Sequence, residues 1–151
     1  SFPQNSLSIY PFGNVNVNDS EHDKNEVDSH CDGCFIPLNV TFIGEYAFVG
    51  CIGLTSIKIP SSVTSIGEWT FGNCLSLTSI EIPSSVTSIG DGAFHGCSGL
   101  TSIEIPSKVT SIGDYAFYNC RNLEIFINNS KENLMVGDAA FYGCKSVKFL
   151  K

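Results

Sequence analysis

Two histidines and two cysteines near the N terminus have residue types and spacing that could bind a metal ion. Cys31 and Cys34 are separated by two residues, His30 directly precedes Cys31, and His22 lies eight residues before His30. Thiolate and imidazole ligands at this spacing are typical of tetrahedral zinc sites. The same cysteines could instead form a disulfide bond or occupy buried positions in a strand.

Five further cysteines could act as nucleophiles if each had a neighbouring base. They are Cys51, Cys74, Cys97, Cys120 and Cys144. His95 lies two residues before Cys97, but the corresponding residues near the other four are Val49, Gly72, Tyr118 and Tyr142. Packing explains such a column better, because free cysteine is small, apolar and readily buried. We therefore predict no catalytic residue and no enzyme activity.

One carboxylate recurs at a similar interval and could bind calcium between neighbouring segments. Its positions are Glu45, Glu68, Asp91, Asp114 and Asp138, each directly after a glycine. A carboxylate at the start of a short helical turn also accepts backbone N–H groups, and this capping accounts for the column without an ion. We therefore predict no bound metal and no other cofactor.

These cysteines and carboxylates belong to a repeat of about 23 residues, a period within the range that is typical of stacked repeat proteins. The phenylalanines Phe48, Phe71, Phe94, Phe117 and Phe141 recur at a constant spacing, except that the last step is one position longer, and the cysteines follow at the same steps. Pro37, Pro60, Pro83 and Pro106 also recur at that constant spacing. In stacked repeats each unit buries its apolar face against its neighbours.

The pattern within one turn predicts a short strand followed by a bend and a helical turn. Residues 100–105 alternate, so that Ile103 and Ile105 point inward, and Pro106 ends the strand because it has no N–H to donate. Val109 and Ile112 are also expected to point inward, with a bend at the next glycine. The segment AFYNC that follows Tyr115 is expected to form the helical turn, with its phenylalanine and cysteine on one face.

The repeat register also suggests where Cys31 and Cys34 lie in the fold. Aligning Pro37 with Pro60 places Cys31 at the position of Leu54 and Cys34 at that of Ile57. Both cysteines are then core-facing residues of a first strand, an interpretation that we favour over a disulfide bond and over a metal site.

The repeat resembles the BspA-type, or Treponema-type, leucine-rich repeats of bacterial and protist surface proteins. Residues 77–99 read LTSIEIPSSVTSIGDGAFHGCSG, close to that family's motif LxxIxIPxxVTSIGxxAFxxCxx, and the resemblance covers residues 35–151. It implies an α/β-type, right-handed leucine-rich-repeat solenoid with a parallel β-sheet on one face and short strands and helical turns on the other. It also implies adhesion and the binding of host proteins.

The chain is expected to divide at residue 34. Residues 1–34 form an N-terminal cap with strand-like alternation in LSIYPF and VNVN and an acidic loop from Asp19 to Ser29, while residues 35–151 form about five turns. The fourth strand departs from the motif, since LEIFINNS places Asn128 and Asn129 where isoleucine and proline stood, and the final turn carries an extra residue. The chain begins with Ser1 rather than Met, which predicts a processed or excised segment.

The charge distribution excludes several classes of partner. Six of the 15 acidic residues lie in residues 1–34 against one lysine, and the remainder is close to neutral, with nine acids and seven bases. Without a basic stripe, neither nucleic acid nor an anionic membrane is an expected partner. No run approaches the roughly 18 apolar residues of a membrane span.

Two surfaces are candidates for binding, because repeats keep the inside constant and vary the outside. The outward positions of the sheet are expected to be Phe35, Lys58, Glu81, Glu104, Ile125 and Ile127, with apolar spots at both ends of a polar and acidic centre. The isoleucines could equally be covered by a cap or a further turn. The alternative surface consists of Tyr46, Trp69 and Tyr115, which could also simply pack on each other between turns.

The sequence therefore predicts a non-catalytic protein-binding module of an extracellular or cell-surface protein, with adhesion to a host or matrix protein as its role. The alternative is a structural spacer that displays another domain. The adhesion role rests on the resemblance and not on any residue of a site.

Overall fold

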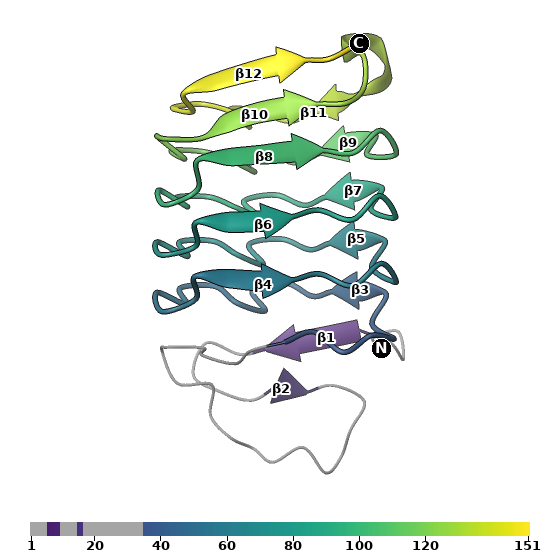
Figure 1. The fold of residues 1–151 in the computed structure, drawn as a ribbon, viewed down its shortest axis with the longest axis vertical. Helices are drawn as coiled ribbons and strands as arrows, with labels where there is room; N and C mark the ends of the chain where they lie inside the picture. Colours follow the sequence, from purple (N-terminus) through teal and green to yellow (C-terminus); the bar gives the residue numbers. More distant parts are fainter. Residues whose placement is uncertain (1–5, 10–14, 17–34) are drawn as a thin grey trace.

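The computed structural model describes residues 6–9, 15–16 and 35–151. Within this part, the repeats stack into a β-solenoid of about five turns, with the N-terminal and C-terminal turns at opposite ends (Figure 1). In Figure 1 the front strands run from left to right and those behind run from right to left as the chain rises. The solenoid is therefore right-handed. The Cys31 and Cys34 motif and the acidic loop lie outside the described residues.

One face of the solenoid is formed by the strands that the sequence predicts. They are β4 (Ser56–Lys58), β6 (Ser79–Glu81), β8 (Ser102–Ile105), β10 (Glu124–Ile127) and β12 (Ser146–Phe149). Each adjacent pair among β8, β10 and β12, and the pair β4 and β6, is parallel. Ile103 and Ile105 point inward and are almost completely buried, and β8 ends just before Pro106, as predicted.

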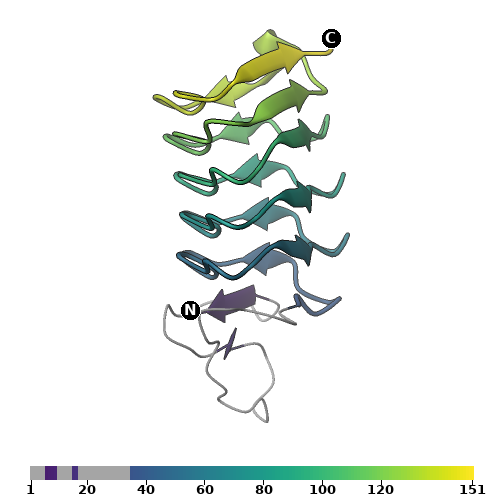
Figure 2. The ribbon, with the colours of Figure 1, turned by 60° about the vertical axis from the view of Figure 1, so that its left-hand side comes forward.

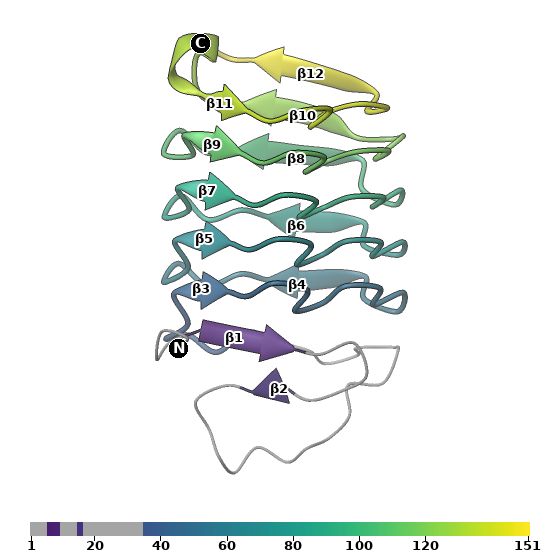
Figure 3. The same cartoon turned by 180° about the vertical axis from the view of Figure 1, so that it is seen from behind.

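The opposite face is a second parallel sheet (Figure 3). Its strands are β3 (Phe42–Ile43), β5 (Ser65–Ile66), β7 (Ser88–Ile89), β9 (Ser111–Ile112) and β11 (Met135–Val136). At the N-terminal end, β1 (Ser6–Ile9) pairs in parallel with β3, and β2 (Val15–Asn16) pairs antiparallel with β1. These two strands lie in the segments where alternation was noted. Val109 and Ile112 point inward, also as predicted.

The predicted helical turns are not formed, which corrects that part of the sequence-based prediction. The only helix among the described residues is a 3-10 helix, η1 (Lys131–Asn133), in the turn that carries the extra residue. At the corner between the two sheets, backbone N–H groups donate to the following turn, as from Phe71 to the carbonyl of Ala93 (2.8 Å) and from Trp69 to that of Asp91 (2.8 Å). Donors used between turns are not available for an α-helix within a turn.

Close approach between turns explains the glycine of the motif. A Cβ on Gly113 would lie 2.7 Å from the carbonyl carbon of Gly90 and would also meet Asp91. Gly67 faces the same restriction, because its Cβ would lie 2.8 Å from the carbonyl oxygen of Ile43. Glycine is needed here for backbone contact between neighbouring turns.

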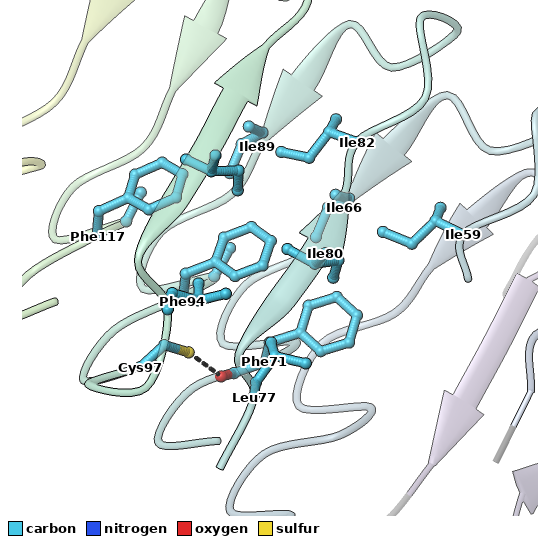
Figure 4. Packing of buried hydrophobic residues seen from close by; sticks show 14 of the residues in the cluster. Ile59, Ile66, Phe71, Leu77, Ile80, Ile82, Ile89, Phe94, Cys97 and Phe117 are labelled. Carbon is cyan, nitrogen blue, oxygen red and sulfur yellow. Dashed lines mark hydrogen bonds between the residues drawn. The ribbon is translucent and has the colours of Figure 1, made fainter. Parts of the chain in front are cut away.

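The core is a series of stacked identical side chains between the two sheets (Figure 4). Rings of Phe48, Phe71, Phe94 and Phe117 stack with centroids 5.1–5.3 Å apart, and all four are buried. Isoleucines from both sheets fill the space beside them. No helix of the described part is long and apolar enough to cross a membrane.

Candidate functional site

The first candidate surface is the outward row of the front sheet, here called the sheet-face row: Lys58, Glu81, Glu104, Phe126 and Lys148. The first three are exposed, and strand pairing aligns Lys58 with Glu81 and Phe126 with both Glu104 and Lys148. The Nζ atom of Lys148 lies 5.9 Å from the centroid of the Phe126 ring. A shallow groove runs over β4 and β6 beside the row.

Two residues predicted for this surface point the other way. Ile125 and Ile127 are fully buried, because Ile125 pairs with Ile103 and Ile127 with Ile105. One residue fewer separates Leu123 from Ile125 than separates the equivalent pair one turn earlier. A one-residue slip moves every side chain of a strand to the opposite face. The sequence-based prediction assumed a constant repeat interval, and it therefore placed Ile125 and Ile127 on the outward face.

The outward residue that the sequence reasoning missed is Phe126. The sequence contains the pattern that places it, because LEIFI alternates and puts Glu124 and Phe126 on the face opposite to the inward residues. At the other end of the sheet face, Phe35 is 70% exposed and Leu38 is 81% exposed, so the predicted apolar spot at this end has exposed side chains.

The second candidate surface lies on the loops between the back and front sheets, which Figure 2 brings forward. We call it the aromatic edge, and it contains the residues Tyr46, Trp69, His95, Tyr115, Tyr118 and Tyr142. Ring centroids are 4.5 Å apart for Trp69 and His95, 5.1 Å for His95 and Tyr118, and 5.2 Å for Tyr118 and Tyr142. Packing between turns therefore occurs, yet Tyr46 and Tyr115 keep 44% and 46% of their surface exposed.

Two glycines make room for the single tryptophan of the chain. A Cβ on Gly72 would lie 2.5 Å from Cε3 of Trp69, and one on Gly92 would lie 2.5 Å from its Cε2. Residues at these two positions are larger in most other turns, as Tyr115 and Tyr118 illustrate. The indole thus occupies space that the glycines leave open.

His95 is the titratable group in the centre of the aromatic edge. Desolvation lowers its pKa below the usual 6.5 and outweighs a smaller opposing effect of its own backbone. Among the described residues, its Nδ1 has no hydrogen-bond partner. The folded protein therefore favours the neutral imidazole, and this contribution to stability is present above pH 6.5 and is lost as the pH falls through the lower folded-state pKa.

Trp69 should report this titration. An imidazolium quenches a neighbouring indole, and the two rings are 4.5 Å apart. We expect tryptophan emission to fall on acidification with a midpoint below pH 6.5. His95→Tyr, which introduces the residue found one turn later, should remove this transition. A midpoint at or above 6.5, or an unchanged transition in the variant, would contradict the assignment.

Comparisons with known proteins identify the repeat. A family model described as BspA type leucine rich repeat region, in six copies, matches residues 28–148. The chain belongs to the BspA-type leucine-rich repeat family. No curated protein matches the chain.

Two solved leucine-rich proteins are similar to it in both sequence and fold. A leucine rich repeat protein of Treponema pallidum is 32% identical with a TM-score of 0.65, over 72% of this chain and 51% of its own. A leucine rich cell surface protein of Faecalibacterium prausnitzii is 35% identical with a TM-score of 0.65, over 77% of this chain and 31% of its own. The chain thus matches about half of the first relative's length and about a third of the second's.

The cysteines of the BspA-type motif donate hydrogen bonds between turns. The thiols of Cys97 and Cys120 lie 3.0 Å from the carbonyl oxygens of Phe71 and Phe94, one turn earlier. Figure 4 shows the contact of Cys97 with Phe71. The Cys144 thiol favours ionisation of Cys120, but the Cys97 thiol and burial outweigh it and raise the pKa of Cys120 to about 12. A thiol held protonated near neutral pH is a poor nucleophile. The predicted packing role of this column is confirmed by the burial of its first four members.

Two carboxylates of the motif, Asp91 and Asp114, also connect turns rather than cap helices. Oδ1 of Asp91 accepts the N–H of Asp114 at 2.8 Å, and Oδ1 of Asp114 accepts the N–H of Asp138 at 2.8 Å. For these two residues the predicted function as acceptors of N–H groups is confirmed, but the donors lie in the next turn. Within the described part of the chain, no group of three or more histidine, cysteine or acidic side chains is arranged to hold a metal ion.

Proposed function

We propose that this chain is a non-catalytic protein-binding module of a surface or secreted protein, and that its partner contacts the sheet-face row. The role that we propose for the module is adhesion to a host or matrix protein. The description of the Faecalibacterium prausnitzii relative as a cell surface protein supports the location. The partner itself is a proposal that rests on the fold family and on the surface described below.

The observation that carries this proposal is a contrast between two exposed columns. Directly before the back strands β5, β7 and β9, the residues Thr64, Thr87 and Thr110 are identical, and Thr87 Oγ1 donates to the carbonyl of Thr64 (3.2 Å). That column has a structural use between turns. The sheet-face row instead changes from lysine through two glutamates and a phenylalanine to lysine, and the side chains of Lys58, Glu81 and Glu104 are exposed. Variation on a regular scaffold supports recognition.

The row also has the composition of a protein contact rather than that of a catalytic site. It places opposite charges and one aromatic ring along a fixed strand spacing of about 4.8 Å. Charged groups at such a surface determine the association rate and the choice of partner, and an aromatic ring adds contact area. A spacer would need no such row, which distinguishes the two functions.

A capture experiment tests this proposal. Immobilised chain is exposed to host cell-surface and matrix proteins, in parallel with Glu81→Lys/Glu104→Lys and with the charge-matched control Glu132→Lys/Asp138→Lys. We expect a saturable partner that the parent and the control retain and the sheet-face variant binds at least about tenfold more weakly. Equal capture by all three proteins would exclude this face. Capture of nothing by the parent would favour the spacer.

A further inference from the structure

The aromatic edge contains residues whose backbone conformation opposes their presence. Tyr46, Trp69 and Tyr115 have φ angles of 60°, 55° and 58°, in the left-handed region. Only glycine adopts this region without a steric cost, and Gly92 occupies the same position in the intervening turn with φ of 63°. Glycine is thus compatible with the fold at this position, yet three turns carry a large aromatic residue.

Burial does not compensate for this cost at two of the three positions. Tyr46 is 44% exposed and has no ring partner among the described residues, and Tyr115 is 46% exposed and meets Tyr118 only edge-on, at 5.5 Å and 66°. Both tyrosines therefore keep nearly half of their surface open to solvent. Strained residues that the core does not require are typical of ligand-binding positions.

The charges beside these rings indicate the kind of partner. Glu45, Glu68 and Asp114 directly precede Tyr46, Trp69 and Tyr115 in the sequence. No ion pair between two described residues includes any of these carboxylates. The loops 44–53 and 67–76, which carry Tyr46 and Trp69, contain no lysine or arginine, and the loop 113–122, which carries Tyr115, contains one cation, Arg121. The edge thus offers aromatic surface and negative charge, and at Tyr46 and Trp69 no lysine or arginine of the same loop competes for it.

We infer that the aromatic edge is a contact surface for lysine and arginine side chains of a partner protein, centred on Tyr46, Trp69 and Tyr115. The aliphatic stem of such a side chain packs on an aromatic ring, and its charge lies over the ring face and close to the preceding carboxylate. The column of carboxylates repels anionic ligands. This surface is distinct from the sheet-face row, so either can fail without the other.

Glycine provides a variant that separates binding from folding. Tyr46→Gly/Tyr115→Gly installs the residue that position 92 already carries, and it leaves the net charge unchanged. If the tyrosines serve binding, the melting temperature should be unchanged or higher, since the left-handed backbone is relieved. A structural function predicts a lower melting temperature. Nonspecific attraction of cations to the acidic chain is equal in both proteins.

The test is a fluorescence titration that uses Trp69, the single tryptophan, as the reporter. We expect a hexa-arginine peptide to change its emission in the parent, and to bind the double variant at least about tenfold more weakly. Hexaglutamate and maltohexaose should cause no change. The inference is overturned by the absence of arginine-peptide binding, by equal affinity for parent and variant, by maltohexaose binding of equal strength, or by a lower melting temperature of the variant.

Discussion

Ile125→Lys should destabilise the solenoid by about 3–5 kcal/mol, the range expected when an unpaired charge is placed in a protein core. Ile125 is fully buried in β10, between its strand neighbours Ile103 and Val147. No acidic side chain of the described core cluster could pair with the ammonium group. Urea denaturation followed by circular dichroism measures the change, provided that the unfolding is two-state.

The adjacent residue is the control for this prediction. Phe126→Lys places the same charge on the outward face of the same strand, between Glu104 and Lys148. We expect it to cost less than about 1 kcal/mol, as surface substitutions do. A register based on a constant repeat interval would place Ile125 outward, and it predicts the larger loss of stability for Phe126→Lys. A larger loss from Phe126→Lys than from Ile125→Lys would show that the register described here is wrong.

Phe94→Ala should have an effect of similar size, about 3–5 kcal/mol, because the lost burial is accompanied by a cavity. Phe94 is fully buried, and its ring stacks between Phe71 at 5.3 Å and Phe117 at 5.1 Å. Collapse around the cavity is limited, because the turns on both sides are fixed by backbone hydrogen bonds. The same urea experiment gives the change in free energy of unfolding.

Leu75→Ala provides the comparison for the phenylalanine. Leu75 is 49% exposed at the loop beside the same core, so its truncation should cost less than about 1 kcal/mol. Equal losses for the two variants would contradict a stability that depends on the stacked phenylalanines. An unchanged slope of free energy against urea in both variants would show that the amount of surface exposed on unfolding is the same.

The sequence predicts the stack, the front strands and most inward residues correctly, because these depend on short-range alternation and on a repeat interval. Ile103, Ile105, Val109 and Ile112 illustrate this, since each follows from its neighbours alone. The helical turns were predicted wrongly because AFYNC has the i, i+3 spacing of a helix, whereas the N–H groups of its Phe117 and Asn119 bond to the next turn. Contacts between turns decide such corners, and the pattern of a single turn does not contain them.

The residues of the two candidate surfaces were predicted less completely than the inward residues of the fold. The exposure of Lys58, Glu81 and Glu104 follows from alternation. One residue fewer lies between Leu123 and Ile125 than between the equivalent residues one turn earlier, and the assumption of a constant interval hid the inward position of Ile125. The position of Tyr46 on the edge was visible as a column, whereas its left-handed backbone was not. Backbone conformation is determined by the pairing of neighbouring loops, which only the assembled structure reveals.

The pairing between turns has a mechanical consequence. Many N–H groups of the corner loops donate to a carbonyl in an adjacent turn, and the pairing of the sheet strands also joins adjacent turns. Tension applied between the two ends of the stack therefore loads these bonds one turn at a time, as in unzipping, rather than shearing many together. Each detached turn, about 23 residues long, releases about 80 Å of extended chain. The molecule would therefore lengthen in steps under force, with one step for each turn that detaches.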